Sequence, residues 1–110
     1  MRSTMSPEAK MEALAGIHQF STCPTGRLAS IAARAEEAVL APGAVLVHEG
    51  QQRGPAYVIL SGQVNVARGG RSMSTVGPGV VVGELSDDPD LRAATITAIT
   101  LIHALMLAAA

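Results

Sequence analysis

From Ala38 onward the chain is a series of short apolar runs separated by turn-forming residues, and this pattern limits the fold more than any other feature. Each run is rich in Val, Ile or Leu, and the breaks between runs contain Gly, Pro and Asp. Strands at such spacing, with turn signals between them, are typical of an all-β sandwich or barrel. The runs are residues 38–40, 45–48, 57–60, 64–68, 72–76, 80–82, 94–98 and 101–107.

Two of the breaks have a more specific pattern. Arg68-Gly69-Gly70-Arg71 predicts a two-residue hairpin, because paired glycines supply the positive φ angles of such a turn. The Asp-Asp-Pro-Asp sequence at residues 87–90 is interpreted either as acids in the first turn of a short helix or as an ordinary solvated turn.

The N-terminal third has helical signals instead. Ser6-Pro7-Glu8 combines a capping side chain, a proline suited to the first helical position and an acid near the helix N-terminus. Gly16 is expected to end this helix. A second helix fits residues 24–35, where four apolar residues share one face. Its start is expected at Thr22 or Cys23, and the apolar residues are Leu28, Ile31, Ala32 and Ala35.

The expected fold is therefore mainly β with flanking helices. A helical lead-in over about residues 7–36 precedes a β-roll over about 38–107, of the jelly-roll or double-stranded β-helix kind. The whole of 1–110 has the length of one domain. With no Trp, one Tyr and one Phe, the core is expected to be aliphatic.

Charge and composition exclude several classes of function. A net charge of −1 gives no electrostatic basis for binding nucleic acid or an anionic membrane. The apolar C-terminal stretch, residues 98–110, is shorter than the ~20 residues that a membrane-spanning helix needs, so a buried strand is expected there. Cys23 is the only cysteine and cannot form an internal disulfide, which fits the cytoplasm.

A short stretch in the C-terminal third carries the strongest functional signal. Gly83-Glu84 opens a turn or short helix, and Arg92 followed by small residues closes it. Backbone N–H groups at such a turn, together with a guanidinium, form a cradle for one phosphate. The Glu84 carboxylate can also accept a hydrogen bond from a sugar hydroxyl. The alternative interpretation is that Arg92 only pairs with Glu84, Asp87 or Asp88.

Other landmarks occur around this stretch in a fixed order. They are Phe20, Ala41-Pro42-Gly43-Ala44-Val45-Leu46, Glu49-Gly50, Tyr57-Val58-Ile59-Leu60-Ser61-Gly62-Gln63-Val64, Val76-Gly77-Pro78-Gly79, Gly83-Glu84-Leu85 and Arg92-Ala93-Ala94-Thr95. In this order and at this spacing they resemble the cyclic nucleotide-binding domain, the sensor module of the catabolite activator protein family, of cyclic-nucleotide-dependent kinases and of gated channels. The resemblance covers about residues 11–107.

The resemblance implies a regulatory, signal-transducing module that binds a cyclic nucleotide, with cAMP favoured over cGMP, and that is not an enzyme and needs no cofactor. By position, Glu84 would accept the ribose 2′-hydroxyl and Arg92 would pair with the cyclic phosphate. Backbone N–H groups around Leu85, Ser86 and Ala93 would complete the phosphate site. Gly83 would let the backbone approach closely.

The chain departs from the family pattern in ways that keep a second hypothesis open. The segment between Glu84 and Arg92 is about one residue short, and Asp87 and Asp88 stand where apolar residues are usual. Each carboxylate near a phosphate opposes binding by on the order of 1 kcal/mol. The loop before residue 55 has Arg53-Gly54 where the family favours Gly-Asp, and the sequence stops after the last strand, where helices usually follow. The alternative is a degenerate fold that acts as a scaffold for a protein partner or for a second copy, without ligand.

Other catalytic chemistry has little support. His18, His48 and His103 lie on separate predicted elements with no His-x-His pair, which argues against a metal site. His48 is expected at the surface and His103 as a hydrogen-bonded strand residue. No Gly-x-Ser-x-Gly motif is present for nucleophilic hydrolysis. No catalytic or metal-binding residue is therefore predicted.

Overall fold

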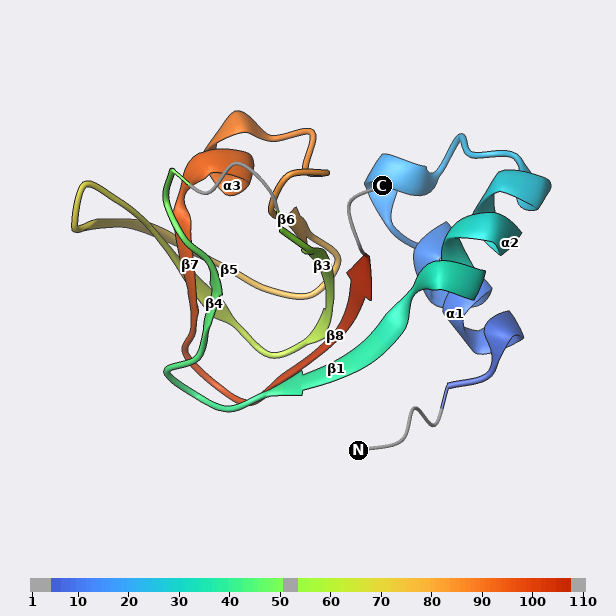
Figure 1. The fold of residues 1–110 in the computed structure, drawn as a ribbon, viewed down its shortest axis with the longest axis horizontal. Helices are drawn as coiled ribbons and strands as arrows, with labels where there is room; N and C mark the ends of the chain where they lie inside the picture. Colours follow the sequence, from blue (N-terminus) through green and yellow to red (C-terminus); the bar gives the residue numbers. More distant parts are fainter. Residues whose placement is uncertain (1–4, 51–53, 108–110) are drawn as a thin grey trace.

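The computed structural model describes residues 5–50 and 54–107, and it contains two four-stranded antiparallel sheets with helices beside them (Figure 1). The helical elements are α1 (Pro7–Ala15), the 3-10 turn η1 (His18–Phe20), α2 (Thr25–Arg34) and α3 (Pro89–Ala93). The strands are β1 (Glu36–Leu40), β2 (Val45–Val47), β3 (Ala56–Ser61), β4 (Val64–Arg68), β5 (Arg71–Val76), β6 (Val81–Val82), β7 (Thr95–Ala98) and β8 (Ile102–Leu107). The predicted β-roll preceded by helices is confirmed.

The two sheets enclose the main core. One sheet has the order β1-β8-β3-β6 and the other β2-β7-β4-β5, with every pairing antiparallel. Between them lies a cluster of small and branched aliphatic side chains, as expected for a chain with so few aromatic residues. Its fully buried members include Ile59, Val64, Val82, Ile96 and Ile102.

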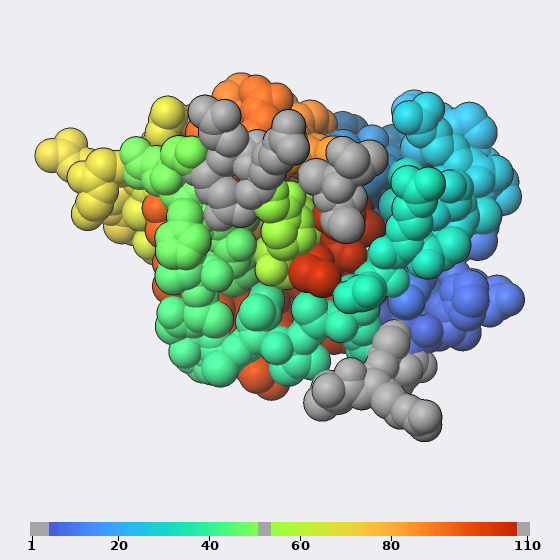
Figure 2. All heavy atoms as spheres, viewed as in Figure 1, coloured from blue at the N-terminus to red at the C-terminus, as the bar shows by residue number. Residues whose placement is uncertain are grey.

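A second core joins the helices to the outer face of β3 and β8. Because successive side chains of a strand point to opposite faces, Ala104 belongs to the first core and Leu105 to the second. Leu14 of α1 and Leu28 of α2 pack in this second cluster together with Val58 and Leu105. The helices α1 and α2 therefore lie beside the roll, at the end opposite the β4–β5 hairpin (Figure 1). Figure 2 shows this hairpin projecting from the body of the molecule.

The helix boundaries confirm one expectation and correct another. Ser6 caps α1 by accepting a hydrogen bond on Oγ from the Ala9 N–H at 3.1 Å, and Gly16 is its C-cap. The expectation that Thr22 or Cys23 would start α2 is wrong, because its N-cap is Pro24, which offers no capping side chain. A proline ring holds the backbone φ that the chain needs before the first helical turn.

The two predicted turns had different outcomes. Arg68 pairs with Arg71 across the β4–β5 hairpin, with φ of 58° at Gly69 and 76° at Gly70, so the two-residue turn is confirmed. For residues 87–90 the turn interpretation is wrong and the helical one is confirmed at Pro89 and Asp90, because Asp88 is the N-cap of α3 and Pro89 is its first residue. The loop before residue 55 is expected to differ at Arg53-Gly54, but Arg53 lies outside the described residues. Residues 108–110 also lie outside them.

Candidate functional site

The segment from Gly83 to Ala94, here called the cassette, leaves β6 through a buried glycine. Gly83 has φ of +98°, and a Cβ atom at this position would lie 3.1 Å from both Ala56 Cα and Pro55 O. The Gly83 N–H donates to the Leu91 carbonyl at 3.0 Å. Gly83 is thus required both by its backbone angle and by the closeness of β3, and its hydrogen bond joins the start of the cassette to α3.

Ser86 organises the middle of the cassette from a buried position. Its N–H donates to the Gly83 carbonyl at 3.0 Å, and its Oγ accepts from the Asp88 N–H at 3.1 Å. Asp88 Oδ1 then accepts from the Asp90 N–H at 2.9 Å, which caps α3. A phosphate that used the Ser86 N–H would compete with its bond to Gly83. The N–H groups of Glu84 and Leu85 have no acceptor within residues 5–50 and 54–107.

Within α3, one apolar side chain of the cassette packs into the core between the sheets. Leu91 is 8% exposed and joins the core between the sheets. Leu85 is 43% exposed, and Asp87 is exposed as well. The apolar contacts beneath the cassette are therefore made by Leu91 and, at its end, by Ala94, whereas Asp87 and Asp88 are exposed.

The two side chains expected to contact a ligand are both solvent-accessible. Glu84, Arg92 and Ala93 are exposed, and the Arg92 N–H donates to the Asp88 carbonyl at 3.0 Å within α3. Among the described residues, no ion pair joins Arg92 to Glu84, Asp87 or Asp88, so the alternative interpretation of Arg92 is not observed.

Gln19 is a residue of this site that sequence reasoning missed. It lies in η1, and its side-chain amide contacts the cassette backbone twice: Nε2 donates to the Leu85 carbonyl, and Oε1 accepts from the Asp87 N–H at 3.2 Å. The two residues are more than sixty positions from Gln19, and no local motif marks such a contact. The helical lead-in is thereby attached directly to the cassette.

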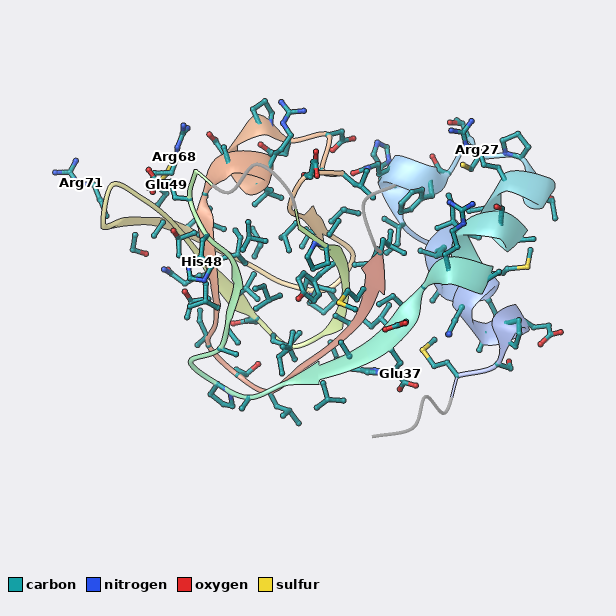
Figure 3. All side chains as sticks on the ribbon, in the orientation of Figure 1. Arg27, Glu37, His48, Glu49, Arg68 and Arg71 are labelled. Carbon is teal, nitrogen blue, oxygen red and sulfur yellow. The ribbon has the colours of Figure 1, made fainter. Side chains whose placement is uncertain are left out.

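A second attachment comes from the β4–β5 hairpin. Arg68 Nη1 lies 3.2 Å from Asp90 Oδ1 of α3, and Figure 3 shows Arg68 next to α3 while Arg71 points away from it. Glu49 Oε1 accepts from the Gly69 N–H at 2.8 Å, and the Glu49 N–H donates to Thr95 Oγ1 at 3.0 Å. Sequence reasoning treated Glu49 only as part of a turn and Arg68 only as part of a hairpin. In the structure Arg68 contacts α3, and Glu49 joins the hairpin to the first residue of β7.

Tyr57 lies next to the start of the cassette. It pairs with Val82 across β3 and β6 and packs against the core between the sheets. Burial of the phenol raises the pKa of Tyr57 above its usual value, because the charged phenolate loses water. The Tyr57 phenol therefore keeps its proton to a higher pH than an exposed tyrosine does.

The remaining titratable residues do not form a second reactive centre. His103 Nε2 lies 2.6 Å from Glu37 Oε2, which confirms His103 as a hydrogen-bonded strand residue, and His48 is exposed as expected. Within residues 5–50 and 54–107, no three His, Cys, Asp or Glu side chains are grouped to hold a metal ion. In the same part of the chain, no helix has the length and apolar character to cross a membrane.

Comparison with known proteins identifies the family to which this chain belongs. Residues 37–110 match the model of the cyclic nucleotide-binding domain, and the chain belongs to this family. Domains of the family are regulatory, not catalytic. The resemblance seen in the sequence is therefore confirmed.

Solved structures with the same fold include eukaryotic and bacterial proteins. The regulatory domain of Toxoplasma gondii protein kinase A with cAMP is 25% identical, with a TM-score of 0.78 over 93% of this chain and 41% of that chain. The regulatory subunit of a cAMP-independent protein kinase A from Trypanosoma brucei is 25% identical, with a TM-score of 0.78 over 92% and 38%. A cyclic nucleotide-binding-like protein from Brucella abortus is 24% identical, with a TM-score of 0.71 over 90% of both chains. This chain thus spans about two fifths of the kinase regulatory chains.

Proposed function

We propose that this protein is a regulatory binding domain for a cyclic nucleotide, with cAMP favoured over cGMP. The observation that carries the proposal is an exposed Arg92 guanidinium without a carboxylate partner in the described part of the chain. Arg92 lies on α3, which is capped by Asp88 and is joined to Gly83 through the Leu91 carbonyl. The similar regulatory domain of Toxoplasma gondii protein kinase A was solved with cAMP, which supports this ligand.

Each side chain of the proposed site has one role. Arg92 pairs with the cyclic phosphate, and Glu84 accepts the ribose 2′-hydroxyl. Backbone N–H groups around Leu85, Ser86 and Ala93 bind the phosphate oxygens, and Gly83 allows the close backbone approach. The domain comprises residues 1–110, needs no cofactor and catalyses no reaction, and its single cysteine fits a cytoplasmic setting.

Calorimetric titration with millimolar cAMP and cGMP tests the proposal. Saturable binding is expected, and Arg92→Ala should weaken it at least about tenfold, since a charge-assisted hydrogen bond is lost. Arg71→Ala is the matched control, because Arg71 is exposed and points away from α3 (Figure 3). No heat with either nucleotide, or an Arg92→Ala variant with unchanged affinity, would contradict the proposal.

A second candidate function is a protein-interaction or dimerisation scaffold that has lost the ligand. It is favoured by the acidic side chains of Asp87, Asp88 and Asp90, all exposed on the cassette, and by the Trypanosoma relative, described as cAMP-independent. A thermal shift with cAMP distinguishes the two functions, because only a protein that binds the nucleotide is stabilised by mass action. Light scattering then shows whether the chain associates with a second copy.

A further inference from the structure

A cavity of about 570 Å³ lies between the helical lead-in, the cassette and the end of β8. Its apolar wall comes from four separate elements: Phe20 of η1, Ile31 of α2, Leu85 of the cassette and Leu107 of β8. Neither Glu84 nor Arg92 lines it. The cavity is therefore distinct from the proposed cyclic nucleotide site, although Leu85 belongs to both regions.

Positive charge borders this apolar wall. Arg27 and Arg34 both line the cavity, and because they are seven residues apart on α2 they lie on the same face of the helix. Within residues 5–50 and 54–107, neither guanidinium forms an ion pair, and no described residue lining the cavity is an Asp or Glu. A cavity with apolar walls and only cationic charge favours a ligand with an apolar body and an anionic group.

We propose that this cavity binds an amphipathic anion, a carboxylate attached to an apolar body such as a medium-chain fatty acid. Its volume lies within the range of small-molecule sites, roughly 300–1,000 Å³. The carboxylate pairs with Arg27 or Arg34, a geometry that the guanidinium fork favours. The apolar body covers Phe20, Ile31 and Leu85, of which Leu85 is 43% exposed, and removes their surface from water.

A small molecule fits the cavity better than a partner helix. The lining residues come from η1, α2, the cassette and β8, so the cavity is bounded by several elements and is not one long helical face. Gln19 also lines the cavity while its side chain donates to the Leu85 carbonyl. The occupant would therefore lie against the same backbone that Gln19 holds.

Titration of the full chain with decanoate, followed by amide NMR and calorimetry, tests this inference. Saturable binding is expected, with the largest shifts at Phe20, Ile31, Leu85 and Leu107. Decanol, which lacks the charge, should bind about tenfold more weakly. The double variant Arg27→Gln/Arg34→Gln should lose a similar factor for decanoate and little for decanol. Arg71→Gln is the matched control, because Arg71 is also an exposed arginine, and it should leave the affinities for decanoate and decanol unchanged.

Several results would overturn the inference. These are equal binding of decanoate and decanol, an unchanged affinity in the double variant, or shifts centred away from the cavity. Displacement of decanoate by an acidic amphipathic peptide that binds more tightly would assign the cavity to a helical partner instead. Leu85→Gln provides an independent variant at an exposed position: it should weaken both decanoate and decanol, and affinities equal to those of the natural protein would also contradict the proposal.

Discussion

Gly83 joins β6 to the cassette at the place where the backbone passes closest to β3. A side chain here faces two separate costs: the positive φ of +98° and the contact of its Cβ with Ala56 and Pro55 at 3.1 Å. Gly79 has a similar φ of +92°, but a Cβ added there would meet no atom within 4 Å, so it has only the first cost. Comparing substitutions at Gly83 and Gly79 therefore distinguishes the cost of the backbone angle from the cost of steric crowding.

We expect Gly83→Ala to destabilise the protein by about 2–4 kcal/mol, because strain and crowding add. Gly79→Ala should cost about 1 kcal/mol, from the backbone angle alone. Urea unfolding of the three proteins measures both values. Equal losses in the two variants would show that the contact with β3 has no energetic consequence.

Tyr57 makes stability depend on alkaline pH. Burial raises the pKa of its phenol above the ordinary value of 10.0, so the folded state holds the proton more tightly than the unfolded state. The resulting stability is fully present below pH 10.0 and is lost as the pH rises through the higher pKa of the folded protein. We expect the unfolding midpoint to fall more steeply above pH 10.0 in the natural protein than in Tyr57→Phe.

The absorbance of phenolate provides a direct check, because Tyr57 is the only tyrosine in the chain. Its titration midpoint should shift downward in urea, where the phenol regains water. The Tyr57→Phe variant differs from the natural protein only by the phenolic hydroxyl, so the difference between the two pH profiles reports on that group. Identical profiles would contradict the predicted effect of burial.

At the scale of elements, η1 is connected to the cassette by one side chain. Gln19 contacts the backbone of Leu85 and Asp87, and Gln19→Ala removes both hydrogen bonds. We expect a loss of about 1 kcal/mol and faster hydrogen exchange at the Asp87 amide, which loses its acceptor. Amide exchange read by NMR or mass spectrometry measures this change.

Gln63→Ala is the matched control for this prediction. Gln63 is exposed, and its side chain has no hydrogen bond among the described residues. Its replacement should leave stability and cassette exchange unchanged. An Asp87 amide that exchanges equally in the natural protein and in Gln19→Ala would show that η1 does not order the cassette.

Local sequence patterns were sufficient for most of the strands and helices. The run predicted at 64–68 coincides with β4, and the glycine pair predicts the hairpin that follows it. β1 begins at Glu36, ahead of the predicted start at Ala38, because Glu36 and Glu37 pair with Met106 and Leu105 of β8. Two consecutive glutamates interrupt the apolar pattern that predicts a strand, but their backbone is nevertheless paired with β8.

The cassette shows where local reasoning ends. Asp followed by Pro is both a turn signal and a helix start, and only the burial of Leu91 in the roll decides for the helix α3. The proposed roles of Gly83 and Arg92 rest on the motifs that surround them in the sequence. The sequence could not identify Gln19, because its contacts join segments that are distant along the chain and depend on how η1 packs.

At the scale of the whole molecule, the helices and the roll share a core through β3 and β8. Leu14 of α1 is fully buried among Val58 and Leu105, so Leu14→Ala should destabilise the protein by about 2–5 kcal/mol. Because the cores meet at the same strands, we expect one cooperative transition, with amide protection in α1 and in β8 falling together. Urea unfolding and native-state hydrogen exchange measure these effects.

Leu101→Ala supplies the comparison, since Leu101 is 62% exposed and its loss should cost less than about 0.5 kcal/mol. Two separate unfolding transitions, with α1 opening while β8 stays protected, would mean that the helical lead-in and the roll are independent units. That outcome would contradict the proposal of one domain.

The position of β8 also has a consequence for how such a sequence can diverge. Leu105 faces the helices and Ala104 faces the roll, so neither of these two buried positions readily accepts a polar residue. In β5, by contrast, every residue from Arg71 to Thr75 is exposed. Over evolutionary time, substitutions should accumulate on β5 and the adjoining hairpin long before they reach β8, and the last strand should retain its ancestral pattern when most of the surface has changed.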